Sequence, residues 1–288
     1  MAILGISLDQ VKNFINKISE LKAKPYDELR QLLKEEEIKK WMGHYIRFLN
    51  YTIEIKSEDF VCYRVRKSEL DTPFFNTSDL IYPPKDKNKM GRMNSNETIV
   101  LYTSLNEFTA ISESRIEKDD YFQLTKFKIE KIMKVYHIGM FSDLLFNHPR
   151  DTDKTKKKIQ ELALSCSDAA IKEFAALECA LIDTFYCSSE QSYLLSSFIA
   201  ESIFLEFQDV DAIMYPTMLN KFGINFAIKK EFVDNHMKIN HSFLNCLVEA
   251  YSNGFYKYNT KYELEEFLND GKLKFTEVKE PYKNNQFR

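Results

Sequence analysis

The stretch Gly91–Glu113, GRMNSNETIVLYTSLNEFTAISE, combines the signals of a loop, a strand and a helix. Residues 98–102 are apolar and largely β-branched, which predicts a buried strand. Residues 104–107 have the spacing of a capping box, and Phe108, Ala110 and Ile111 form the apolar face of the helix expected after it. The strand therefore leads directly into a helix, as in an α+β fold.

Three polar side chains flank these elements. Arg92 precedes the strand, Tyr102 lies near its end, and Glu113 lies about two turns into the helix. A guanidinium fork, an aromatic ring and a carboxylate suit a ligand that carries a pyrophosphate, a planar base and ribose hydroxyls. We therefore expect a dinucleotide site here.

Four short motifs share their order and spacing with a known family. They are Tyr63-Arg64, Gly91-Arg92-Met93-Asn94, Leu101-Tyr102 and Thr109-Ala110-Ile111-Ser112-Glu113. A second group follows in residues 193–200 and in 211–217, which ends Tyr215-Pro216-Thr217. Over roughly residues 58–230 the chain resembles the RES-domain family. It departs from that pattern at Met93, where an aromatic is common, in lacking a glycine after Asn94, and at Thr217, where many members have serine.

The resemblance implies an ADP-ribosyltransferase-like fold, with a mixed β-sheet core and surrounding helices, that cleaves NAD. Such proteins are often toxins neutralised by an antitoxin that carries a DNA-binding helix-turn-helix. By the same resemblance Glu113 and Tyr102 are the catalytic candidates, and the NAD-binding candidates are Arg64, Arg92, Asn94 and Ser196. Ser189, Ser192 and Ser197 crowd the same stretch as Ser196 and are the alternatives for the family serine.

These residue types match the chemistry of NAD cleavage. Arg64 and Arg92 can bind the two negative phosphates bidentately. Breaking the nicotinamide-ribose bond builds positive charge on the ribose, which the Glu113 carboxylate can stabilise while it holds a ribose hydroxyl. Tyr102 can stack on nicotinamide or bond to a ribose hydroxyl, and Ser196 can position a phosphate or the amide.

The acceptor stays open at this point. Water would give ADP-ribose, inorganic phosphate as co-substrate would give ADP-ribose 1″-phosphate, and a protein side chain would make the enzyme a mono-ADP-ribosyltransferase. A catalytically degenerate module that binds a nucleotide or an antitoxin is the alternative from another class.

Composition and motif content argue against several classes of fold and binding site. The 288 residues include only 7 glycines and contain neither G-x-G-x-x-G nor a Walker loop, which argues against Rossmann and P-loop folds. A net charge of −3 gives no basic field for direct nucleic-acid binding. No apolar run is long enough for a membrane span and no secretion signal is evident, so we expect a cytoplasmic protein. The five cysteines and five histidines lack disulfide and zinc spacings, which predicts no metal and no required cofactor.

The pattern along the chain predicts three parts. Residues 1–55 read as an N-terminal helical appendage, with Ser7 and Gln10 capping its first helix and Pro25 restarting a second. Residues 56–230 form the RES-like catalytic core, and residues 231–288 a C-terminal helical extension packed on it. The two extensions are the surfaces expected to serve an antitoxin partner or a homo-oligomer.

Overall fold

The computed structural model describes residues 7–48, 52–139, 168–186, 190–217, 219 and 223–279. The chain divides into two compact units, each built from three separate stretches. We call residues 1–53, 88–98 and 134–215 the helical unit, and residues 54–87, 99–133 and 216–288 the sheet unit. This division differs from the linear one expected, because the N-terminal helices share their unit with residues 134–215.

The helical unit begins with α1 (Leu8–Ala23), α2 (Tyr26–Leu32) and α3 (Glu36–Phe48). The predicted capping box is confirmed, since the Gln10 amide donates to Ser7 Oγ at 3.2 Å and the Ser7 amide donates to Gln10 Oε1 at 2.8 Å. The apolar face of α1 is buried, and Phe14 stacks on Trp41 of α3 with ring centroids 5.0 Å apart. The helical reading of this segment is therefore confirmed over its described part.

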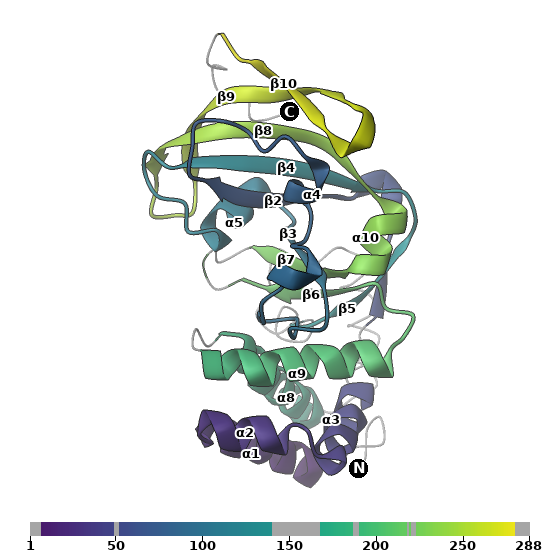
Figure 1. The fold of residues 1–288 in the computed structure, drawn as a ribbon. Coiled ribbons are helices and arrows are strands. Elements are labelled where there is room, and N and C mark those ends of the chain that lie inside the picture. The colour runs from purple at the N-terminus through teal and green to yellow at the C-terminus, as the bar shows by residue number, and fades with distance from the viewer. Residues whose placement is uncertain are drawn as a thin grey trace. The chain divides into compact units, whose positions relative to one another are not determined.

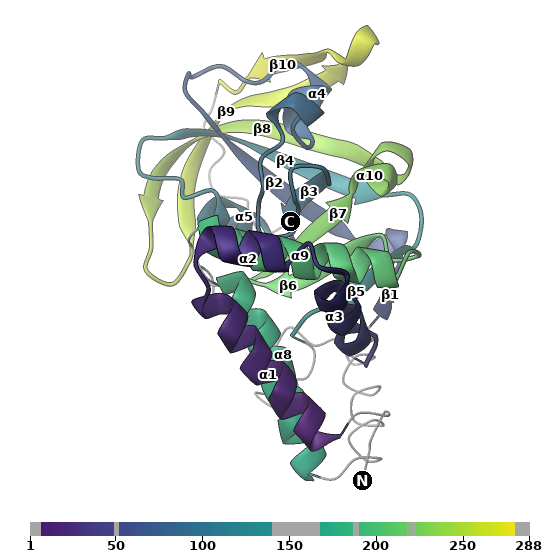
Figure 2. The same ribbon diagram turned by 60° about the horizontal axis from the view of Figure 1, so that its bottom comes forward.

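The remainder of the helical unit comprises α8 (Asp168–Tyr186), α9 (Glu190–Glu206) and short strands. Helix α1 packs on α8, and α3 packs on α9 (Figure 2). Strand β5 (Met133–His137) pairs in parallel with β6 (Ala212–Pro216), and β1 (Thr52–Ile55) lies beside β5. The apolar pattern of residues 153–185 predicts a long helix, of which α8 is the described part, and residues 153–167 lie outside the described residues.

The sheet unit contains seven antiparallel strands in the order β7-β3-β2-β4-β8-β9-β10 (Figure 1). Their bounds are β7 (Ile224–Lys229), β3 (Val100–Ser104), β2 (Val61–Ser68), β4 (Tyr121–Ile129), β8 (Met237–Ala250), β9 (Tyr256–Phe267) and β10 (Leu273–Glu277). Helices α4 (Thr77–Leu80), α5 (Glu107–Glu113) and α10 (Lys230–His236) and the 3₁₀ turns η1 (Ser57–Asp59), η2 (Lys85–Lys87) and η3 (Asn269–Gly271) connect them. An α+β fold with a large mixed sheet is thus confirmed.

The expected C-terminal helical extension is wrong. After α10 the chain forms β8, β9 and β10, and β8 pairs with β4 from Tyr121 to Ile129. The segment does carry a period-two pattern, which is typical of a strand, at Tyr256, Tyr258, Thr260, Tyr262 and Leu264. Pairing with β4 satisfies the backbone amides and carbonyls of this segment and decides its structure.

The predicted capping box at Ser104–Glu107 is also wrong. Ser104 is the last residue of β3, and Asn106 caps α5 by accepting from the Thr109 amide at 2.8 Å. Ser104 is instead paired with Asn225 in the ladder of β3 and β7, and its hydroxyl donates to Asn225 Oδ1 at 2.7 Å. Ser104 therefore lies beside the candidate site.

Candidate active site around Glu113

Glu113 is the last residue of α5, a helix held against the sheet by its apolar side. Ala110 and Ile111 are buried in one cluster with Val65 of β2 and Phe122 and Leu124 of β4. This packing fixes α5 over β2 and leaves the Glu113 side chain partly exposed at the end of the helix. A short helix anchored in this way holds its last side chain at a defined position.

Two neutral side chains orient the Glu113 carboxylate. Asn225 Nδ2 donates to Glu113 Oε1 at 2.8 Å, and the Thr217 hydroxyl donates to the same oxygen. The Leu219 amide donates to Thr217 Oγ1 at 3.1 Å, which leaves the Thr217 proton directed toward Glu113. The carboxylate is therefore held from two sides.

Gly223 makes the approach of Thr217 possible. A Cβ at this position would lie 2.4 Å from Thr217 Cγ2 and 2.5 Å from Thr109 Oγ1 of α5. The Thr217 amide also donates to the carbonyl of Gly223, the residue before β7, at 3.2 Å. This bond holds Thr217 beside the start of β7. Only glycine lets these two segments and α5 come this close.

The strand ladders align the residues around Glu113. Tyr63 of β2 lies opposite Ser104 of β3, and Ser104 lies opposite Asn225 of β7. Directly opposed residues project to the same face of a sheet, and so do residues two apart on one strand. Tyr102 therefore shares the face of Ser104 and Asn225, the face on which Glu113 lies. The structure thus brings the two predicted catalytic residues to one side of the sheet.

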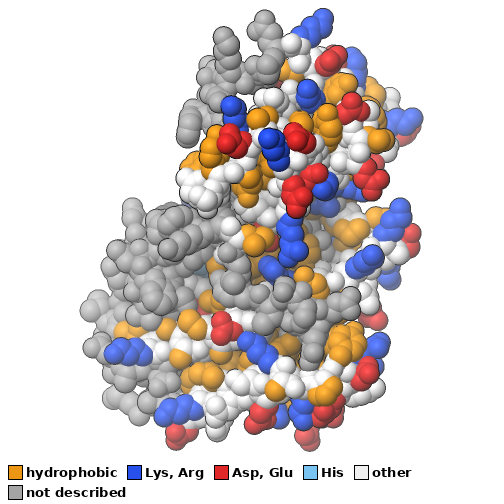
Figure 3. All heavy atoms as spheres, turned by 90° about the vertical axis from the view of Figure 1, so that its left-hand side faces the viewer, with side chains coloured by type: hydrophobic (Ala, Val, Ile, Leu, Met, Phe, Trp, Pro, Cys, Tyr) orange, Lys and Arg blue, Asp and Glu red, His pale blue; other side chains and the backbone are white. Residues whose placement is uncertain are grey.

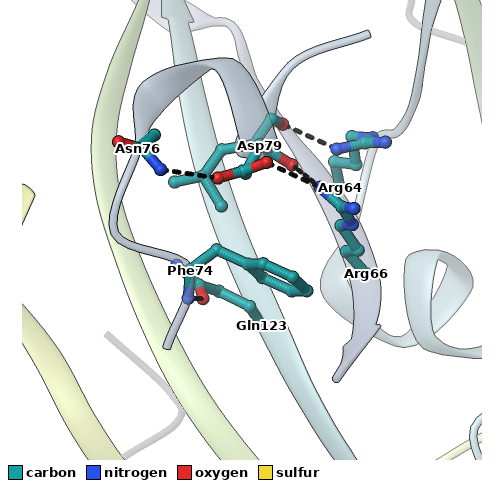
Figure 4. A network of polar contacts seen from close by, with 7 residues as sticks. Arg64, Arg66, Phe74, Asn76, Asp79 and Gln123 are labelled. Carbon is teal, nitrogen blue, oxygen red and sulfur yellow. Dashed lines mark hydrogen bonds and ion pairs between the residues drawn. The ribbon is translucent and has the colours of Figure 1, made fainter. Parts of the chain in front are cut away.

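Arg64 projects from β2 to the other face. Tyr63 and Val65 pack on the cluster beneath α5, so the residue between them points away from α5. Figure 4 shows Arg64 and Arg66 reaching the segment around α4, where Arg64 Nη1 donates to the Leu80 carbonyl at 2.8 Å. Burial, and to a lesser extent repulsion from Arg66, lower the pKa of the Arg64 guanidinium to about 10.

The two neighbouring arginines differ in their partners. Arg66 forms an ion pair with Asp79 at 3.6 Å and lies 4.2 Å from the ring centre of Phe74. Arg64 has no carboxylate partner among the described residues, and its one hydrogen bond goes to a neutral carbonyl. A partly buried cation without a counter-ion is unfavourable in the free protein and suits an anionic ligand.

Arg92 and Asn94 belong to the helical unit. They lie in a tight turn in which the Gly91 amide donates to the Asn94 carbonyl at 3.0 Å. Asn94 is 3% exposed, and its Nδ2 donates to the carbonyls of Lys89 at 3.0 Å and Ser95 at 2.8 Å. Asn94 therefore holds the shape of the turn that carries Arg92.

Ser196 lies in α9, also in the helical unit. Its side chain is fully buried and its hydroxyl donates to the Tyr193 carbonyl at 3.4 Å, one turn earlier in the helix. Direct contact with NAD would require this region to open. Its assignment to the substrate remains a prediction.

Thr217 and Asn225 are the residues that the sequence analysis missed. Thr217 was noticed only as a departure from the serine of many RES members, and no role was expected for Asn225. Since a threonine hydroxyl donates as a serine hydroxyl does, the Tyr-Pro-Thr motif was the available signal for Thr217. Asn225 gave no signal, because its contact with Glu113 depends on strand pairing.

Comparisons with known proteins found no match. The chain matches no model of a protein family, and searches of curated proteins and of solved structures found no similar protein. Within the described ranges, no three His, Cys, Asp or Glu residues are grouped so that they could hold a metal ion. No helix in that part of the chain has the length and apolar character to cross a bilayer.

Proposed function

We propose that this protein degrades NAD by cleaving the bond between nicotinamide and ribose. One observation carries the proposal: a glutamate at the position that the resemblance implies accepts hydrogen bonds from two neutral side chains, which orient its carboxylate. Such a carboxylate can stabilise an oxocarbenium-like ribose. Arg64, a partly buried cation without a carboxylate partner in the described chain, offers a point for anion binding on the other face of the sheet.

The residues of the sheet unit take the following roles in this proposal. Glu113 faces ribose C1′ and accepts a hydrogen bond from a ribose hydroxyl. The C1′–N bond breaks with its electron pair moving to nitrogen, so nicotinamide leaves neutral and needs no proton. Tyr102 packs beside the nicotinamide ring or the ribose. Arg64 projects to the other face of the sheet, so its expected phosphate-binding role belongs to the binding alternative described below. Arg92, Asn94 and Ser196 keep the roles that the resemblance implies.

An oxygen nucleophile then attacks C1′. Water gives ADP-ribose and releases a proton, which makes the protein a glycohydrolase. Inorganic phosphate gives ADP-ribose 1″-phosphate, which makes it a phosphorylase, and a protein side chain gives a mono-ADP-ribosylated target. In each case we propose an intracellular toxin or defence effector, restrained by a cognate antitoxin.

A second function has a specific observation in its favour. Strand alternation directs Arg64 and Glu113 to opposite faces of the sheet. A module that binds a nucleotide phosphate at Arg64 without turnover needs no convergence of the two residues. This alternative predicts NAD binding with no products.

Incubation of pure protein with NAD, with and without phosphate, tests the proposal when products are separated by chromatography. We expect nicotinamide release from wild type and a loss of turnover by about a hundredfold or more in Glu113→Ala, with NAD affinity little changed. Glu117→Ala, an exposed glutamate four residues later, is the matched control. Retained turnover in Glu113→Ala would remove Glu113 from the mechanism, and binding without products would favour the alternative.

A further inference from the structure

A chain of hydrogen bonds leads from the interior of the sheet to the Glu113 carboxylate. Ser104 Oγ lies 2.7 Å from Asn225 Oδ1, and Asn225 Nδ2 lies 2.8 Å from Glu113 Oε1. Ser104 and Asn225 are each 3% exposed, so water does not compete for these bonds. Both residues occupy opposed positions of paired strands, β3 and β7.

The direction of each bond in this chain is fixed. An amide oxygen only accepts, so the Ser104 hydroxyl is the donor to Asn225. The reversed amide would place Oδ1 against a carboxylate oxygen and lose the bond to Glu113, whereas the Ser104 hydroxyl could accept from Nδ2 instead. The Glu113 carboxylate therefore selects the orientation in which Asn225 donates to it, and Ser104 anchors the amide oxygen in that orientation.

We infer that Asn225, anchored by Ser104, is a positioning residue that holds the Glu113 carboxylate in its orientation for catalysis. The inference rests on the proposed function. A cation in the place of Asn225 would bind the carboxylate as well but would cancel the charge needed at the ribose. A second carboxylate there would repel Glu113 and favour its protonation.

Substitution of Asn225 by aspartate tests this inference, because the shape is kept while the donor becomes an acceptor. We expect the acidic limb of the kcat–pH profile to move upward by about one pH unit or more, since two carboxylates at hydrogen-bond distance resist ionising together. Asn225→Ala removes the donor without adding charge, so we expect kcat to fall about tenfold to a hundredfold with the limb unmoved. KM for NAD should change little in both variants.

Asn245 provides a matched control. It is a fully buried asparagine on β8 of the same unit, and its Oδ1 accepts from Thr260 Oγ1 at 2.8 Å as that of Asn225 does from Ser104. Asn245→Asp should lower the melting temperature without moving the pH profile. An equal shift in both aspartate variants would show a general effect of burying charge and would overturn the inference.

A measurement independent of turnover separates this inference from the proposed function. Carbon-13 NMR of side-chain carboxyls follows the titration of Glu113 directly, assigned by its loss in Glu113→Gln. In Asn225→Asp we expect Glu113 to titrate at higher pH than in wild type, whether or not the protein cleaves NAD. An unchanged titration in a folded Asn225→Asp protein overturns the positioning role, whereas absent NAD cleavage in wild type overturns only the proposed function.

Discussion

At the scale of single residues, the candidate site is built from neutral donors around an acid and from a cation that lacks a counter-ion. Thr217 and Asn225 hold Glu113, whereas Arg64 is held only by a backbone carbonyl. Proteins retain a buried unpaired charge at a cost in stability, and sites that bind charged ligands are where this cost is commonly found. Removing the charge of Arg64 should therefore weaken ligand binding with little loss of stability.

Arg64→Met tests whether Arg64 serves ligand binding rather than stability. The variant removes the charge while it keeps much of the side chain's length. We expect the free energy of unfolding to stay within about 1 kcal/mol of wild type, because the lost hydrogen bond is offset by relief of the buried charge. Affinity for NAD should fall at least about tenfold, measured by calorimetry.

Two further variants sharpen this prediction. Arg64→Lys keeps the charge but loses the fork, so NAD affinity should weaken. Arg66→Met loses the ion pair with Asp79 and serves as the neighbouring control. Destabilisation by about 3 kcal/mol or more in Arg64→Met would mark Arg64 as structural, and unchanged affinity in both Arg64 variants would show that the phosphates bind elsewhere.

At the scale of elements, the C-terminal strands are integral to the core of the sheet unit. Leu247 of β8 and Tyr258 of β9 are buried in the same cluster as Ile111 of α5. The helix that ends at Glu113 therefore rests on side chains from a segment far along the chain. The position of Glu113 depends in part on strands of a segment that the sequence predicted to be a helical extension packed on the core.

Leu247→Ala measures this dependence. Leu247 is fully buried, so we expect a loss of about 2–5 kcal/mol in the free energy of unfolding, followed by urea denaturation. Leu268→Ala, at a leucine that is 43% exposed beyond β9, should change it by no more than about 0.5 kcal/mol. Similar small effects in both variants would contradict the placement of β8 in the core.

At the scale of the whole molecule, the predicted site residues are divided between two units. Arg64, Tyr102 and Glu113 belong to the sheet unit, whereas Arg92, Asn94 and Ser196 belong to the helical unit. Acidic and basic side chains are interspersed on the face shown in Figure 3, in keeping with a net charge of −3. Such a surface offers little attraction to nucleic acid as a bulk polyanion.

Expression in bacteria tests the proposed function in the intact chain. Wild type should lower intracellular NAD and arrest growth, and Glu113→Ala should do neither at equal protein levels. Intracellular NAD is measured by an enzymatic cycling assay. Growth arrest with intact NAD would contradict depletion and point to modification of a protein target.

Local elements whose signals lie within one turn or one strand could be predicted from the sequence alone. The sequence predicted the Ser7–Gln10 cap and the strand before α5, because capping and periodicity depend on neighbours in the chain. It also indicated Arg64, Tyr102 and Glu113 as candidate site residues. The helical prediction was wrong at residues 237–277, where apolar and aromatic residues are compatible with either a helix or a strand. The strand conformation of β8 is stabilised by its pairing with β4.

The contacts between side chains that are distant in sequence follow from the tertiary structure and could not be predicted from the sequence. Glu113 receives its donors from Thr217 and Asn225, more than a hundred residues away, because β3 pairs with β7 and Gly223 admits the close approach of Thr217. Strand alternation likewise decided that Arg64 and Glu113 project to opposite faces. Spacing along the chain carries no information on either point, since both arise from the register between strands that are distant in sequence.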